Sequence, residues 1–186
     1  MKLSSPAVAL GLLTLSCTRP SEPPAAAVTP TLKPHSNLAQ VMRGIPFTFA
    51  NIVFDAQSED PGAPRQGSES GGATAQFKSV YGGWQEVENS ALALAETANL
   101  VMIPGRLCEN GKPVPVDDQV YREAAQGLAA AGQAAFKAAQ SKSMDAIVEV
   151  SDTIAVACAN CHEPYRDFDD PRDRCTPAGA STARAE

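Results

Sequence analysis

The residues best suited to chemistry lie close together near the end of this 186-residue chain: Cys158, Cys161 and His162, within the run Cys-Ala-Asn-Cys-His. A Cys-x-x-Cys-His run is the pattern by which c-type haem is attached to a protein. On a helix the two cysteines lie one turn apart on one face, so both sulfurs can reach the two vinyl groups on one edge of a porphyrin. His162 would then bind the iron as proximal ligand. The motif predicts one haem c (iron) per chain.

Two other chemistries use a Cys-x-x-Cys pair. A dithiol redox site of the thioredoxin type needs a βαβ context, which the sequence does not indicate. A zinc site would need two further ligands, and His35 is the only other histidine in the chain. A haem enzyme such as a peroxidase ranks below a carrier, because no distal His and Arg pair is evident. We therefore expect no enzymatic activity.

Composition limits the fold and the partners. The chain has 15 Lys and Arg against 21 Asp and Glu, a net charge of -6, so electrostatics do not favour binding to nucleic acid. Aromatic residues make up only 5% of the chain, and alanine is abundant. This composition suits close-packed helices better than sheets. We expect an all-α fold.

Proline positions and apolar periodicity predict the elements that must position the motif. Proline is costly inside a helix, and apolar residues recur here at spacings of three and four, so we expect helices over about 36–56, 84–102, 117–140 and 143–168. Ser36 is the expected N-cap of the first and Pro46 should kink it, while Val120 opens the apolar face of the third. A long Gly, Ser and Pro-rich connection is expected over 60–75. Four such helices pack economically as an antiparallel bundle, with the haem near the end of the fourth.

The motif and its place in the chain resemble a known family. Residues Cys158 to Arg166 read Cys-Ala-Asn-Cys-His-Glu-Pro-Tyr-Arg, and this run at the C-terminal end of a four-helix chain resembles the class II c-type cytochromes, the cytochrome c′ group. The resemblance covers about 38–168 and includes the stretches 41–45, 51–55, 91–100 and 104–106. It implies a haem held inside the bundle, with Tyr165 beside the porphyrin and Arg166 near a propionate or the haem edge.

The same resemblance bears on the sixth ligand of the iron. In the low-spin branch of the family a methionine of the first helix takes that position, and Met42 stands at the matching place; Met102 is a weaker candidate. The alternative is that Met42 only fills the core, which leaves a five-coordinate haem protein that binds a diatomic gas such as NO or CO. Arg43 and Arg106 are either further propionate partners or solvated surface arginines.

Met42 as ligand predicts a periplasmic cytochrome that carries single electrons between redox partner proteins. Family members also form homodimers through their first two helices, so the resemblance implies a dimer here.

The N-terminal residues predict export. Residues 1–16 read as a signal peptide and 17–35 as a Pro and Ala-rich tether. Two alternatives stay open for Cys17: it is acylated, as in a bacterial lipoprotein that the segment resembles, or cleavage follows 25–27 and leaves a soluble secreted protein. Either alternative places the mature chain outside the cytoplasm, in the periplasm or anchored to its membrane.

The remaining cysteines, Cys108 and Cys175, flank the cytochrome domain expected over 36–168. Cys175 belongs to a polar C-terminal tail, 169–186. In an oxidising compartment two otherwise unexplained cysteines suggest a disulfide, and the alternative is a bond from Cys175 to another chain.

Overall fold

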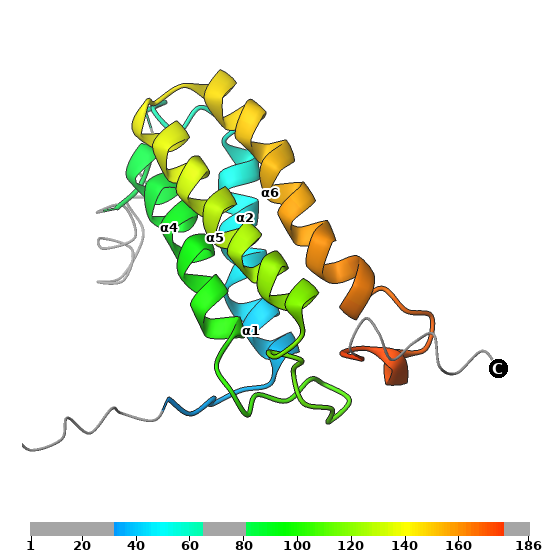
Figure 1. Ribbon diagram of the computed structural model, residues 1–186. Coiled ribbons are helices and arrows are strands. Elements are labelled where there is room, and N and C mark those ends of the chain that lie inside the picture. The colour runs from blue at the N-terminus through cyan, green and yellow to red at the C-terminus, as the bar shows by residue number, and fades with distance from the viewer. Residues whose placement is uncertain (1–31, 65–80, 177–186) are drawn as a thin grey trace, which may run out of the picture. The chain divides into compact units, whose positions relative to one another are not determined.

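The computed structural model describes residues 32–64 and 81–176, and within them it is built of helices without a β-strand. The first helical segment is α1 (Leu38–Gly44) followed directly by α2 (Pro46–Asp55), and the others are α4 (Trp84–Val101), α5 (Gln119–Gln140) and α6 (Met144–Tyr165) (Figure 1). A short 3-10 turn, η1 (Pro171–Asp173), follows α6. The prediction of an all-α fold is confirmed for these residues.

The first helical segment breaks at the predicted proline. Ile45, at φ -123° and ψ -76°, separates α1 from α2, and Pro46 opens α2. Proline is tolerated at that first position because its missing N–H would have no helical partner there. The N-cap of α1 is Asn37 and not Ser36: the Asn37 side chain accepts from the Gln40 backbone, and the Gln40 side chain accepts from the Asn37 backbone. Such a reciprocal pair satisfies two N–H groups.

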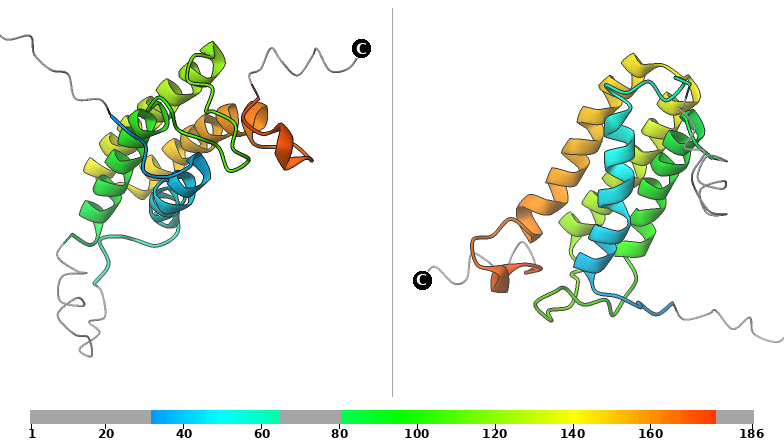
Figure 2. Two further views of the ribbon diagram at one scale, coloured as in Figure 1. Left: turned by 90° about the horizontal axis from the view of Figure 1, so that it is seen from below. Right: turned by 180° about the vertical axis from the view of Figure 1, so that it is seen from behind.

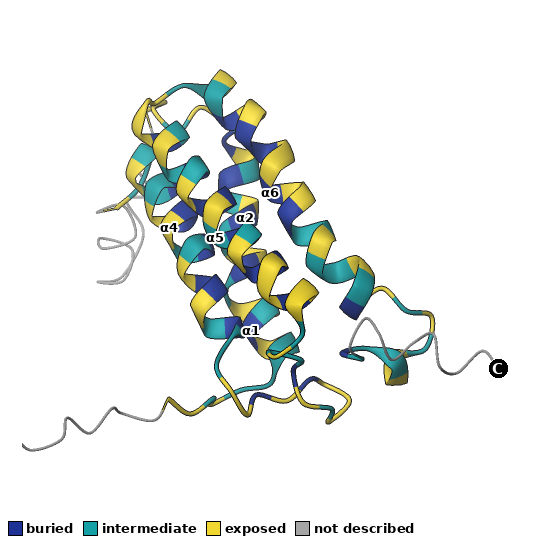
Figure 3. Cartoon of the chain, in the orientation of Figure 1, coloured by how far each residue is buried: buried dark blue, intermediate teal, exposed yellow. Residues whose placement is uncertain are grey.

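The helices pack against one another through small residues. The α4–α5 contact is the most extensive, and α5 also packs against α6. A Cβ atom at Gly132 would lie 2.5 Å from the backbone nitrogen of Ala95 and 2.9 Å from the carbonyl oxygen of Ala91, so only glycine allows these two helices to approach so closely. Figure 3 shows the buried positions on the faces that the helices turn toward one another. The fully buried members of the core include Val53, Ala91, Leu94, Ala135, Ile147 and Ile154.

The apolar face of α5 begins one residue later than expected. Val120 is 42% exposed, so its assignment to the core is wrong, whereas Tyr121 is 1% exposed. The two side chains lie about 100° apart around the helix axis. Tyr121 is the one that faces α6, where its ring meets Tyr165.

The end of α6 and the chain after it leave the helical layer. Helix α6 ends at Tyr165, three residues before the expected end, and Pro164 lies in its last turn. In both side views α6 diverges from α1 toward this end (Figures 1 and 2). Residues 166–176, which we name the C-terminal strap, turn back through η1 toward the α4–α5 loop. The strap therefore bridges the separated ends.

Several expectations fall on residues outside those described. They are the signal peptide 1–16, Cys17, most of the tether 17–35, the connection after residue 64 and the tail after Thr176. Among the helices described, none is long and apolar enough to cross a membrane.

Candidate cofactor site

A cavity of about 610 Å³ lies where α6 diverges, which is within the size range of small-molecule and cofactor sites. Its walls come from α1, α2, α5, α6, the α4–α5 loop and the C-terminal strap. Most lining side chains are apolar, among them Leu38, Ala39, Pro46, Phe47, Ala50 and Phe54. The six cofactor-site residues predicted from the sequence all line this one cavity: Met42, Cys158, Cys161, His162, Tyr165 and Arg166.

The two cysteines of the motif enter the cavity from the last turns of α6. Both are half-buried free thiols. Burial raises the pKa of Cys158 and raises that of Cys161 to about 11, with the neighbouring Cys158 adding to the latter. A catalytic dithiol needs the opposite, a lowered pKa that supplies thiolate. The site therefore favours thiols as points of covalent attachment over dithiol redox chemistry.

His162 follows Cys161 on the same helix and is half-buried. Burial lowers the pKa of His162, and the positive charge of Arg166 lowers it further. Its imidazole is consequently neutral near pH 7 and has a lone pair to offer a metal. The His162 carbonyl accepts from the backbone nitrogens of Arg166 (2.8 Å) and Asp167 (2.9 Å), so the chain turns directly beneath the histidine.

Met42 reaches the same cavity from α1 and is partly buried. Met102 packs among core residues and does not line the cavity. His35 is exposed ahead of α1. Among the candidate sixth ligands, only Met42 shares the cavity with His162.

An aromatic pair closes the inner end of the cavity. Tyr165 and Tyr121 meet edge to face, with ring centroids 5.3 Å apart and planes at 81°. The Tyr121 hydroxyl donates to the Val101 carbonyl at 3.3 Å. Burial raises the pKa of both phenols, so both stay protonated and uncharged. Tyr121 had no signal in the motif, and only the phase of the α5 stripe could have revealed it.

Arginines gather at the rim of the cavity. Arg43 and Arg166 line it as predicted, and Arg174 of the strap joins them. Arg106 does not: it is only 3% exposed and donates to the carbonyls of Ser36 at 2.7 Å and Leu100 at 3.0 Å. Both expectations for Arg106, propionate partner and solvated surface residue, are therefore wrong. Its guanidinium instead fastens the segment before α1 to the end of α4.

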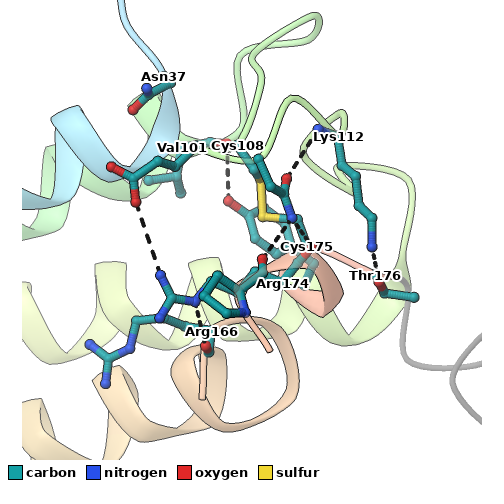
Figure 4. The surroundings of a disulfide bond; sticks show 12 residues. Asn37, Val101, Cys108, Lys112, Arg166, Arg174, Cys175 and Thr176 are labelled. Atoms are coloured by element: carbon teal, nitrogen blue, oxygen red, sulfur yellow. Dashed lines mark hydrogen bonds and ion pairs between the residues drawn. A yellow bond between two sulfur atoms is a disulfide. The ribbon is translucent and has the colours of Figure 1, made fainter. Parts of the chain in front are cut away.

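Cys108 and Cys175 form a disulfide that closes one wall of the cavity (Figure 4). They are 67 residues apart in sequence, and their Cα atoms are 6.5 Å apart. Cys108 lies in the α4–α5 loop, and Cys175 ends the C-terminal strap. Both are buried. Sequence reasoning paired these cysteines but did not place them at the cavity.

The residues present fit a haem c. Two free thiols and a neutral imidazole line one apolar cavity of suitable size, with guanidinium groups at its rim for carboxylates. In residues 32–64 and 81–176 no group of three or more His, Cys, Asp and Glu side chains is placed to hold a metal ion. Haem iron asks less of the protein, because only its axial ligands are side chains.

We compared the chain with known proteins. No family model, curated protein or solved structure matches it.

Proposed function

We propose that this protein is a c-type cytochrome of the class II type, an antiparallel four-helix bundle that carries single electrons on one covalently bound haem. The observation that carries the proposal is the convergence of Cys158, Cys161, His162 and Met42 on one apolar cavity. The first three come from a single motif, whereas Met42 comes from a helix more than 100 residues earlier in the chain.

In this proposal the two thiols fix the cofactor. Each thiol adds across one vinyl group: a sulfur–carbon bond forms, the vinyl double bond becomes single and the thiol proton passes to the neighbouring carbon. No oxidant is needed, but the thiols must be unpaired, as Cys158 and Cys161 are. Their positions one turn apart on α6 set the orientation of the ring.

His162 and Met42 would hold the iron from two different helices. Neutral imidazole is the form of histidine that binds metal, and a thioether in the sixth position raises the reduction potential. When bound, the haem supplies the one-electron couple. The apolar side chains of α1 and α2 keep water away from it, which also favours a higher potential.

The proposed location is outside the cytoplasm, where the disulfide between Cys108 and Cys175 is at home. The partners would be other redox proteins. A lipid on Cys17 and a dimer through α1 and α2 remain proposals from the resemblance.

Absorption spectra of the oxidised and reduced protein, with and without carbon monoxide, test the carrier function. Ligation by His162 and Met42 fills both axial positions, so we expect low-spin spectra that carbon monoxide leaves unchanged. High-spin spectra with ready binding of carbon monoxide would instead identify a five-coordinate protein that binds diatomic gases.

A further inference from the structure

The charge of the cavity lining differs from that of the whole chain. Its lining contains three guanidinium groups, Arg43, Arg166 and Arg174, and one carboxylate, Glu109, a net of +2. The whole chain has a net charge of -6. A cavity with this lining complements a ligand that carries carboxylates.

The three arginines differ in how closely they meet a carboxylate of the protein. Nη1 of Arg43 donates to Glu109 at 3.2 Å, and Nε of Arg166 donates to Asp167 at 2.6 Å. Nη1 of Arg174 lies 4.0 Å from Glu109, beyond hydrogen-bond distance, while its Nε donates to the Arg166 carbonyl at 3.1 Å. Of these three, Arg174 therefore has the terminal guanidinium nitrogens best placed to accept a new carboxylate.

The position of Arg174 depends on the C-terminal strap being tied down. The next residue, Cys175, is bonded to Cys108, and its backbone nitrogen donates to the Tyr165 carbonyl at 2.8 Å. Nδ2 of Asn110 contacts the carbonyl oxygens of Pro171, Arg172 and Arg174 at 3.1, 3.3 and 2.9 Å. Figure 4 shows the disulfide beside Arg174.

The backbone of Cys175 adds a second sign that the strap is held in place. Its φ of 60° lies in the left-handed region, which residues other than glycine adopt at a cost of order 1 kcal/mol or more. Such a conformation persists where the surroundings determine it, as the disulfide and the bond to Tyr165 do here. The strap therefore has one defined position, and Arg174 is held at the rim.

We propose that Arg174 is a carboxylate-binding residue of the cofactor site and that the Cys108–Cys175 disulfide holds it there. The inference rests on the proposed function, since the carboxylates are those of the haem. A guanidinium matches a carboxylate through two parallel hydrogen bonds. Its charge also favours the reduced iron centre over the oxidised one, because the oxidised centre carries one more positive charge.

The midpoint potential of the purified holoprotein tests this role. We expect Arg174→Gln to lower the potential, and more strongly at low salt than at high salt. Arg172→Gln is the matched control: Arg172 is on the same strap, its side chain is 88% exposed, it pairs with Asp170 and it does not line the cavity. Its potential should equal that of the unaltered protein. Equal potentials in all three proteins would overturn the proposal.

The role of the disulfide is tested by combining changes. The double variant Cys108→Ser with Cys175→Ser should lower the potential, and adding Arg174→Gln to it should lower the potential little further, because the two changes remove the same contact. Full additivity of the two shifts would show that Arg174 acts without the disulfide and would contradict the second half of the proposal.

Two controls keep these outcomes distinct. If the unaltered protein holds no covalent haem, the proposed function fails; if it holds haem but Arg174→Gln leaves the potential unchanged, only this inference fails. Should the glutamine variant not fold by circular dichroism, Arg174→Lys replaces it. Lysine keeps the charge but loses the two-nitrogen fork, so a smaller shift of the same sign is expected, and no shift would count against Arg174.

Discussion

At the scale of the residue, Met42 decides between two haem functions. It is the one candidate for the sixth ligand that lines the cavity together with His162. As a ligand it makes the protein an electron carrier. As a simple core residue it leaves an open coordination position, where a diatomic gas could bind.

Replacing Met42 with Ala should convert a low-spin haem spectrum to a high-spin one that responds to carbon monoxide, because the thioether would be lost from the iron. Absorption spectra of the holoprotein measure the change. Met102→Ala is the matched control, since Met102 packs in the core and does not line the cavity; its spectrum should stay low-spin. A low-spin spectrum in the Met42 variant would clear Met42 of the role.

Single residues also show where reasoning from the sequence reached its limit. A motif and a methionine at a matching position were enough to name six residues that the structure brings to one cavity. Arg106 and Arg174 were not assigned correctly, because an arginine has the same sequence signature whether it is solvated, buried or at a rim. Arg106 is buried only because the segment before α1 lies over the end of α4, which is a tertiary contact.

At the scale of the element, the closest helix contact offers the sharpest test of the packing. Gly132→Ala should destabilise the protein by about 1 to 3 kcal/mol, because the new methyl group would meet the backbone of α4 at Ala95 and Ala91. Chemical denaturation of the full chain measures this change.

The matched control lies on the same helix. A Cβ atom at Gly127 would meet nothing within 4 Å, so Gly127→Ala should stabilise the protein by about 0.5 to 1 kcal/mol through helix propensity. If both substitutions changed stability alike, the close approach of α4 and α5 at Gly132 would be contradicted.

The helices themselves were largely predictable, and their ends less so. Proline-free windows and apolar periodicity located each described helix to within a few residues. The cap at Asn37 and the end of α6 at Tyr165 were missed, since both depend on which backbone groups find a partner. The outward position of Val120 was missed because α5 begins at Gln119, which sets the phase of its first turn.

At the scale of the whole molecule, the four cysteines in the described residues all line one cavity but serve two ends. Cys158 and Cys161 are free, whereas Cys108 and Cys175 are bonded to each other. The disulfide ties the C-terminal strap to the α4–α5 loop, across the gap that the divergence of α6 leaves. The sequence could suggest the pair, but its place beside the motif depends on the path of the strap, which Asn110 helps to hold.

Intact-mass spectrometry of the denatured protein, produced with export and c-type cytochrome maturation, tests covalent attachment directly. We expect the mature chain to carry the added mass of one haem and, with its disulfide intact, no thiol that can be alkylated. The double variant Cys158→Ser with Cys161→Ser should lack that added mass. An unaltered chain whose mass includes no haem and whose Cys158 and Cys161 are both free to be alkylated would contradict a c-type cytochrome.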